Sequence, residues 1–270
     1  MAGPTAAAGG GTIDPRNPAR PTPEVATVSD ETDAIVLRTI RYAEADSVLA
    51  LYTRERGRLA AIAKGARRPR SRLGGRLQPG VRARVTLHAG RGDLAVVRGA
   101  HVVEPHAGLW VAGYRLRAAG CVLEAALRVL EEREPNEDAY HLLCRTLGLL
   151  ARAPVRAEPP RLDPVVLGSQ CKLLVVAGIF PLLGRCALCG AGPPLVAFSA
   201  RAGGALCRGC AAAGEAMAPE VARALAGLVG RPLAGAAEAC PPAVAPAVER
   251  AVSQVLREHL GVTLRSAAPL

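Results

Sequence analysis

Aromatic residues and lysine are both scarce in this chain of 270 residues. Phe, Trp and Tyr make up 3% of the sequence, so any core is aliphatic and rings that could stack on bases are few. Lys64 and Lys172 are the only lysines, while Arg, Ala, Gly and Pro are abundant, as a GC-rich coding bias would produce. The formal net charge of +11 therefore says little about an acidic partner by itself, and the position of the charge matters more.

Segments that would mark a membrane or a secreted protein are also missing. No stretch approaches about 18 consecutive apolar residues. The start, MAGPTAAAGGGT, has neither the basic region nor the leucine-rich core of a secretory signal. We therefore expect a cytoplasmic protein without membrane contact, whose thiols stay reduced. The eight cysteines are then metal ligands or buried apolar side chains, not a disulfide framework.

The usual catalytic signatures are absent as well. The sequence contains neither the Gly-x₄-Gly-Lys-[Ser/Thr] loop of nucleotide-hydrolysing enzymes nor a Gly-x-Ser-x-Gly elbow. None of the five histidines begins the His-x-Glu and Pro-Cys-x-x-Cys pattern of the zinc deaminases. We therefore predict that the protein is not an enzyme.

The sequence does have one concentrated basic region. Residues 54–76 contain nine Arg or Lys and a single acid, Glu55. Most of these cations fall in AKGARRPRSRLGGRLQPG, residues 63–80, where six glycines and prolines rule out a long helix. The pattern predicts a long basic loop. We expect Gly74, Gly75 and Gly80 to let this loop fold closely around a bound strand.

Five short strand patterns surround this loop, at residues 34–40, 48–53, 59–65, 81–88 and 94–103. RERG, between the second and third, predicts a hairpin turn with Gly57 at positive φ. Five strands in about seventy residues favour a small closed barrel of the OB-fold type, which we assign to residues 31–107. The basic loop then joins the third and fourth strands. Residues 1–30, rich in Ala, Gly, Pro and Thr, are expected to be a disordered leader.

From residue 108 onward the hydrophobic period is that of helices. The first helical region, up to Pro135, is expected to bury Leu109, Tyr114, Leu116, Leu123, Ala126, Leu127 and Leu130. Further helices are predicted at 137–152, from the cap Asp163 to Val176, at 219–229, and at 244–260 before Gly261. The chain is therefore predicted to be a multi-domain α+β protein, in which a helical domain, residues 108–270, follows the barrel.

The helical domain is interrupted by CALC and CRGC, a Cys-x₂-Cys-x₁₇-Cys-x₂-Cys pattern. Two such knuckles can aim four thiolates at one tetrahedral zinc ion, with the intervening residues forming a hairpin. We predict one structural zinc in a module at about residues 184–213, with ligands Cys186, Cys189, Cys207 and Cys210. The alternative is four unrelated buried cysteines.

A barrel with a cationic loop is typical of proteins that bind single-stranded nucleic acid. Only two aromatic residues fall in the barrel region, Tyr42 and Tyr52, and we expect both to be packing residues. Affinity should then come mainly from neutralised phosphates, with little sequence preference.

The segments IVLRTIRYAEADSVLALYTRERGRLAAIAKGARRPRSRLGGRLQPG, GIFPLLGRCALCG and FSARAGGALCRGC, set around a helical region, resemble the RecO family of recombination mediators. The similarity runs from about residue 33 to the C-terminus and leaves the leader outside. It implies a nucleoid-associated DNA repair protein that binds single- and double-stranded DNA and anneals complementary strands. With RecR, such a protein helps RecA displace single-strand-binding protein, whose acidic C-terminal tail the helical domain receives. Matched by motif, the expected DNA contacts are Arg38, Arg54, Arg56, Lys64, Arg67, Arg68, Arg70, Arg72 and Arg76.

Two other functions remain open on the residues alone. An OB barrel with a basic loop also fits an RNA-binding or ribosome-associated zinc protein, which competition between matched RNA and DNA strands would separate. An enzyme of nucleic-acid metabolism is disfavoured by the missing motifs, and a cleavage or ATPase assay would reveal it.

Overall fold

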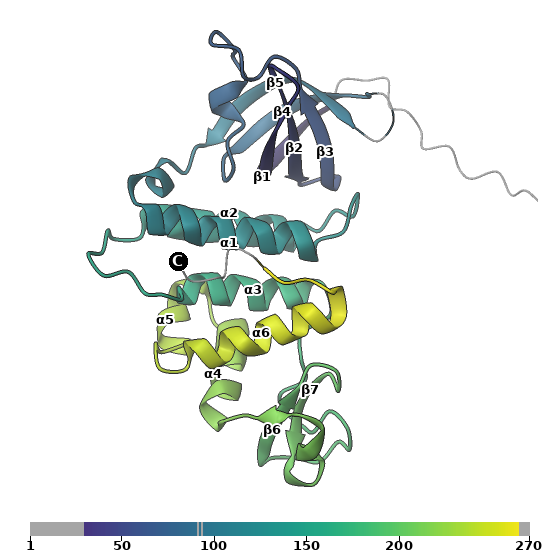
Figure 1. The fold of residues 1–270 in the computed structure, drawn as a ribbon, viewed down its shortest axis with the longest axis vertical. Helices are drawn as coiled ribbons and strands as arrows, with labels where there is room; N and C mark the ends of the chain where they lie inside the picture. The colour runs from purple at the N-terminus through teal and green to yellow at the C-terminus, as the bar shows by residue number, and fades with distance from the viewer. Residues whose placement is uncertain (1–29, 91, 93, 265–270) are drawn as a thin grey trace, which may run out of the picture.

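A computed structural model gives the fold and describes residues 30–90, 92 and 94–264 (Figure 1). The expected leader lies outside the described residues except for Asp30, which already begins a strand. The molecule is elongated, with a barrel at one end, helices in the middle and a small cysteine-bearing hairpin at the other end. Within the described ranges, no helix is long and apolar enough to cross a membrane.

The N-terminal half forms a closed five-stranded barrel, which confirms the predicted OB-type architecture. Its strands are β1 (Asp30–Tyr42), β2 (Asp46–Thr53), β3 (Gly57–Ala63), β4 (Arg82–His88) and β5 (Ala95–Glu104). They follow the order β1-β2-β3-β5-β4, and β1 pairs antiparallel with both β2 and β4. A short parallel contact between β3 and β5 closes the barrel.

The hairpin turn between β2 and β3 has the predicted conformation. Gly57 has a φ of +65°, and the Thr53 hydroxyl donates to its carbonyl O at 3.0 Å. A Cβ atom at Gly57 would lie 2.1 Å from the carbonyl O of Glu134, which belongs to the helical half. Glycine is therefore required here both by the turn and by the close approach of another segment.

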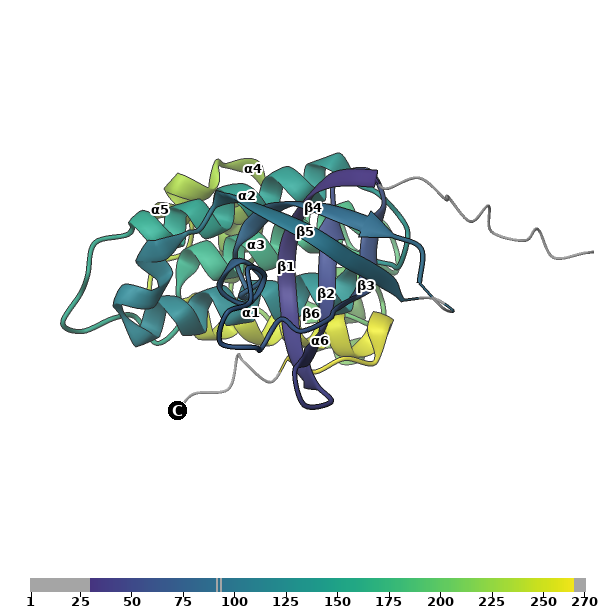
Figure 2. The ribbon, with the colours of Figure 1, turned by 90° about the horizontal axis from the view of Figure 1, so that it is seen from above.

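The helices lie below the barrel in the view of Figure 1 and extend sideways beyond it in Figure 2. They are α1 (Gly113–Val129), α2 (Glu137–Arg152), α3 (Pro164–Val176), α4 (Pro219–Gly230), α5 (Ala236–Ala239) and α6 (Ala245–Leu260). The Asn136 side chain caps α2 by accepting from Ala139 N at 2.9 Å, and Asp163 caps α3 by accepting from Val165 N at 2.8 Å. Gly261 ends α6 with a φ of +64°, as predicted.

The buried face predicted for this region is mostly confirmed, since Leu109, Leu123, Ala126 and Leu130 are buried, but its start differs. Leu116 is 39% exposed, whereas Arg115 is buried and its Nη1 donates to the carbonyl O atoms of Gly108 at 2.9 Å and Ala151 at 3.2 Å. The cause is a break before the helix, because residues Ala107–Val111 form a separate 3₁₀ turn, η2, and α1 starts only at Gly113. The hydrophobic pattern therefore predicts most of the buried face, and it fails at Leu116, in the first turn of α1.

Barrel and helices share one core. Ile35, Leu37 and Tyr52 of the barrel belong to the buried cluster that the helices form. At the edge of this contact, Arg82 Nη2 donates to Asp33 Oδ2 at 2.8 Å and Arg82 Nε donates to the Tyr140 hydroxyl at 3.1 Å. The division of the chain into two separate domains between residues 107 and 108 stays a prediction.

The interruption of the helical half is the predicted hairpin. It consists of β6 (Leu195–Ser199), β7 (Gly204–Cys207), the 3₁₀ turn η3 (Arg208–Ala213) and the short strand β8 (Glu215–Ala216). These strands form a sheet of order β7-β6-β8 at the end of the molecule farthest from the barrel (Figure 1).

Candidate nucleic-acid interface and metal site

The basic loop joins β3 to β4, as predicted, and the barrel holds it in place. The backbone N–H of Gly65 donates to Asp46 Oδ1 at 2.7 Å, and that of Arg67 donates to Ala45 O at 2.9 Å. At its other end, the Thr39 hydroxyl donates to Leu77 O at 2.8 Å. Ala66 and Leu77 are buried in the barrel core. The loop therefore has a defined shape, although its only regular element is the 3₁₀ turn η1 (Gly74–Arg76).

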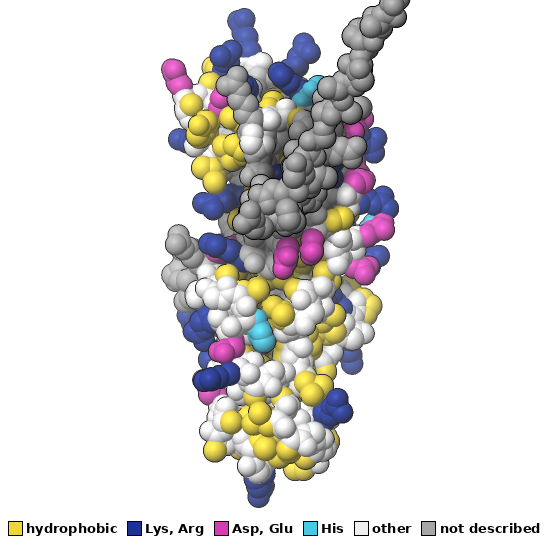
Figure 3. Space-filling model, turned by 90° about the vertical axis from the view of Figure 1, so that its right-hand side faces the viewer, with side chains coloured by type: hydrophobic (Ala, Val, Ile, Leu, Met, Phe, Trp, Pro, Cys, Tyr) yellow, Lys and Arg dark blue, Asp and Glu magenta, His cyan; other side chains and the backbone are white. Residues whose placement is uncertain are grey.

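The cations of this loop are exposed to solvent and have no acidic partner among the described residues. Those concerned are Lys64, Arg67, Arg68, Arg70, Arg72 and Arg76, all of which are exposed. Within the described part of the chain none of them forms an ion pair, and Arg76 Nη1 donates to the carbonyl O of Ala100 at 2.9 Å. Figure 3 shows Lys and Arg side chains projecting around the barrel end of the molecule.

Strand β1 carries two more exposed cations. Arg38 is exposed, and its neighbour Thr39 holds the end of the loop through Leu77. Arg41 is also exposed and pairs in register with Ser47, next to the turn that receives the start of the loop. Arg41 was not among the predicted contacts. A second cation three residues after Arg38 on the same strand was the available signal.

Arg54 and Arg56 lie at the other end of β3 and are engaged within the protein. Arg54 pairs with Glu137 at the start of α2, and Arg56 pairs with Asp30. Arg58, in the same turn, donates from Nη1 to Glu132 Oε1 at 2.9 Å. The nine predicted DNA contacts thus fall into an unpaired group, made of the loop and Arg38, and a paired group at the turn.

Two glycines of the loop serve its own packing. A Cβ atom at Gly74 would lie 2.4 Å from the carbonyl O of Ala66, and Gly80 has a φ of +85°. Only Gly75 of the three has open space around it. Gly74 and Gly80 are therefore needed to fold the loop itself, and the expectation that the three glycines let the loop fold closely around a bound strand stays a prediction.

The four cysteines of the two knuckles come together, as their spacing predicts. The sulfur atoms of Cys186, Cys189, Cys207 and Cys210 all lie within 4.8 Å of one another. Backbone bonds shape the first knuckle, with Cys186 N donating to Ala191 O at 2.8 Å and Gly190 N donating to Cys186 O at 2.9 Å. The four thiols are close enough to hold one metal ion.

The pKa values of two of these thiols are shifted in opposite directions. Hydrogen bonds from the backbone N–H groups of Cys207 and Cys189 lower the pKa of Cys186 to about 6. The hydrogen bond to the Cys189 thiol, together with burial, raises the pKa of Cys210 to about 12. Four adjacent sulfurs cannot all ionise without a cation, because each thiolate disfavours the next. A metal ion would supply that cation.

Both halves of the chain match models of a known protein family. The model described as "Recombination protein O N terminal" matches residues 28–106, and "Recombination protein O C terminal" matches residues 112–268. The chain belongs to the RecO family. Relatives named DNA repair protein RecO include one from Anaeromyxobacter dehalogenans (strain 2CP-C), 37% identical over 240 residues, covering 84% of this chain and 90% of the relative. Another, from Desulforudis audaxviator, is 40% identical over 185 residues, covering 67% of this chain and 70% of the relative.

The helical half of this RecO-family chain contains a groove that the sequence did not predict. Its volume is about 1100 Å³, and α2, α3 and the segment after α4 line it. Leu142, Leu149 and Val176 are among its apolar side chains. Its charged residues are the cations Arg145, Arg152 and Lys172 and, at the start of α2, the acids Glu137 and Asp138. Because three separate segments line the groove, no pattern within a single stretch of sequence predicts it. We call it the helical groove.

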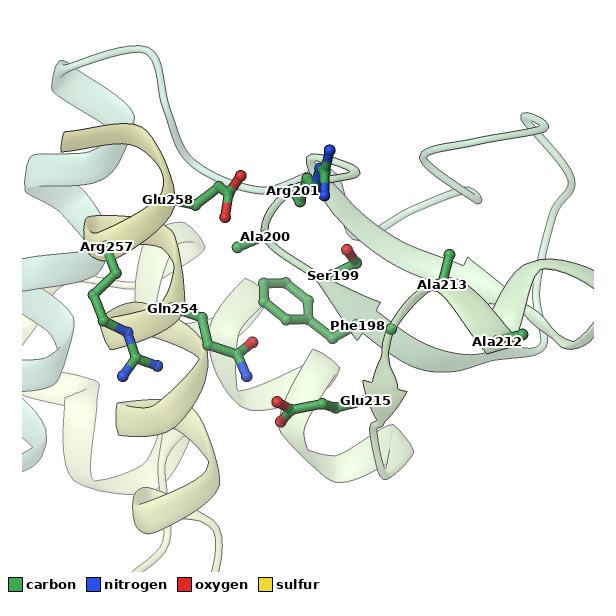
Figure 4. Close-up of a pocket in the computed structure, with 11 residues that line it drawn as sticks. Phe198, Ser199, Ala200, Arg201, Ala212, Ala213, Glu215, Gln254, Arg257 and Glu258 are labelled. Atoms are coloured by element: carbon green, nitrogen blue, oxygen red, sulfur yellow. The ribbon is translucent and has the colours of Figure 1, made fainter. Parts of the chain in front are cut away.

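A second, smaller hollow of about 470 Å³ lies between α6 and the cysteine-bearing hairpin (Figure 4). Phe198 lies at its centre, with Arg201, Arg257, Glu215 and Glu258 around it. Charges of both signs balance here, so charge gives this hollow no preference for a polyanion.

Proposed function

We propose that this protein is a recombination mediator that binds single- and double-stranded DNA and anneals complementary strands. With RecR it helps RecA onto DNA coated with single-strand-binding protein. The observation that carries the proposal is the set of exposed, unpaired cations held on one loop of an OB-type barrel. The names of the curated relatives support DNA as the polyanion. We assign the protein no turnover chemistry of its own and a cytoplasmic, nucleoid-associated location.

Phosphate groups are the ligands that these cations suit. An arginine guanidinium can hold a phosphate through two parallel hydrogen bonds, and nothing in that contact depends on the base. Arg38 and the loop cations have no acidic partner among the described residues and can bind phosphate directly, although Arg76 must first release the carbonyl O of Ala100. Arg54 and Arg56 must first exchange an acidic partner for a phosphate, so we expect them to contribute less to affinity.

The deciding experiment combines strand binding with strand annealing. Labelled single strands, duplexes and a single-stranded RNA of matched sequence are titrated at fixed salt, and annealing of complementary DNA strands is then followed with and without the protein. We expect both DNA forms to bind and annealing to accelerate. A clear preference for RNA together with unchanged annealing would instead favour the RNA-binding alternative.

We assign one structural zinc ion to Cys186, Cys189, Cys207 and Cys210. Two sulfurs that each lie about 2.3 Å from a tetrahedral zinc are about 3.8 Å apart. The Sγ atoms of Cys189 and Cys207 are separated by 3.6 Å, which supports this fit. Four sulfur ligands leave no position for water, so the metal stabilises the hairpin and does no catalysis.

The helical groove is our candidate for the acidic C-terminal tail of single-strand-binding protein. An apolar floor with cations at its side suits a peptide that carries both carboxylates and apolar side chains. Lys172 Nζ already donates to Val229 O at 2.6 Å, so its charge is fixed at the wall of the groove. Arg145→Glu should abolish binding of a labelled tail peptide and leave DNA binding intact. Unchanged peptide affinity would rule out the groove.

A further inference from the structure

Trp110 is the only tryptophan of the chain, and its side chain is 51% exposed. It belongs to η2, the 3₁₀ turn between β5 and α1. Buried Leu109 anchors this turn, while Trp110 and Val111 beside it remain in solvent. Leaving a large ring in water forgoes the free energy that its burial would supply. An exposed tryptophan in a protein so poor in aromatic residues is therefore a candidate for contact with a ligand.

The turn that carries Trp110 lies against the end of the basic loop. His106 Nδ1 lies 2.8 Å from the carbonyl O of Gly80. A Cβ atom at Gly80 would lie 3.3 Å from Leu109 Cδ1. The end of the loop at Gly80 and the turn that carries Trp110 are thus packed against one another.

The helix that follows Trp110 adds a cation to this surface, because Arg117 is exposed and no acid occurs between Trp110 and Leu123. The nearest acid before the turn, Glu104, accepts from His106 N at 3.3 Å. Arg76 Nη1 donates to Ala100 O in β5, so one loop cation is held on the strand that leads to η2.

We propose that Trp110 stacks on an unpaired base of a single strand whose phosphates are bound by the basic loop. The proposal rests on the proposed function and extends it. The cations do not distinguish paired from unpaired strands, whereas a stacking ring needs a base whose face is free. Trp110 therefore gives this surface a preference for single strands that charge alone cannot give.

The tryptophan itself reports the contact, because no other tryptophan contributes to its fluorescence. Titration with a single strand of about fifteen nucleotides should quench the emission strongly. The matched control is an oligonucleotide of the same length made of abasic residues, which keeps the phosphates and lacks the bases. It should bind with little quenching. Equal quenching by both probes would overturn the stacking contact, since phosphates alone would then explain the change.

Substitutions at position 110 test whether binding needs a flat aromatic ring or only a large apolar side chain. Trp110→Leu should weaken single-strand binding about tenfold, in line with the usual cost of losing one stacked base, and should leave duplex binding within about twofold. Trp110→Phe should restore most of the lost affinity. Val111→Ala is the matched control, because Val111 is 68% exposed in the same turn and has no ring.

Two further outcomes are informative. Failure of the unaltered protein to bind any DNA would overturn the proposed function and this contact with it. Normal DNA binding by Trp110→Leu would overturn the contact alone. If that variant also lost affinity for RecR, the exposed ring would be a protein-docking residue instead.

Discussion

Reversing three charges of the basic loop is the most direct test of the nucleic-acid interface. The variant is Arg67→Glu, Arg68→Glu, Arg70→Glu. All three side chains are exposed, and none forms an ion pair with another described residue. Their charges are therefore available to phosphates, and removing them breaks no ion pair within the described protein.

The expected loss follows from counterion release. Each phosphate contact to a single strand contributes about −0.7 to the slope of log K against log salt. At about 0.1 M salt, one lost contact lowers affinity roughly fivefold, and three lost contacts lower it about a hundredfold. Reversal adds repulsion, so a hundredfold is a lower bound. The slope itself should become less steep by about 2.

The same variant should fold normally. The backbone bonds that pin the loop, Arg67 N to Ala45 O and Arg68 N to Gly65 O, do not involve the altered side chains. Exposed substitutions of this kind usually change stability by no more than about 0.5 kcal/mol each. Thermal unfolding followed by circular dichroism, and the metal content, should both match the unaltered protein.

Fluorescence anisotropy with a labelled single strand at several salt concentrations measures the effect. The matched control is Arg201→Glu, Arg223→Glu, Arg250→Glu, which makes the same change in net charge on exposed residues of the other half. We expect the control to lose less than about threefold. Unchanged affinity in the well-folded loop variant would refute the interface, and equal losses in both variants would mean that only total charge matters.

Four further results are expected. For the unaltered protein, log K for a single strand should fall with log salt at a slope of about −3 to −4, if about five phosphates are neutralised; a slope near zero would exclude the loop as the binding surface. Cys186→Ser or Cys207→Ser should lower zinc content and melting temperature together, and Cys121→Ala should leave zinc content unchanged, as atomic emission and calorimetry would measure. Burial lowers the pKa of His106, so the unfolded chain binds the proton more readily, and urea unfolding should show this part of the stability intact above about pH 6.5 and declining below it. His106→Asn, which tolerates the positive φ of 47°, should flatten that decline. Gly57→Ala should destabilise the protein strongly in the same assay, because its Cβ would meet Glu134 O; a loss below about 0.5 kcal/mol would contradict this reading.

Local signals account for what could be predicted of the fold. Helix α2 begins and ends where the sequence indicates, because Asn136, Glu137 and Asp138 start it with a cap and first-turn acids. Helix α3 follows the Asp163 and Pro164 pair in the same way. The cysteine cluster could also be predicted from local sequence, since the spacing within each knuckle already aims two sulfurs at one point.

Features that depend on distant contacts were missed. Tyr42 is 56% exposed, although it was expected to pack, while Tyr52 is buried and bonded to Asn136 across the barrel–helix contact. The two tyrosines lie at opposite ends of the β1–β2 pair, and only the end that holds Tyr52 is covered by the start of α2. The unpaired state of the loop cations and the pairing of Arg54 also depend on which segments fold beside them. Sequence spacing carries no information on that.

Because the barrel holds the basic loop in place, the loop affects both the rate of DNA binding and the heat-capacity change that accompanies it. Its backbone is already fixed by Asp46, Ala45 and Thr39, and its two apolar anchors, Ala66 and Leu77, are already buried. A loop that ordered itself on DNA would bury new apolar surface and give a large negative heat-capacity change. Here that change should be small, and encounters should succeed at a rate set by electrostatic steering, falling steeply as salt is added.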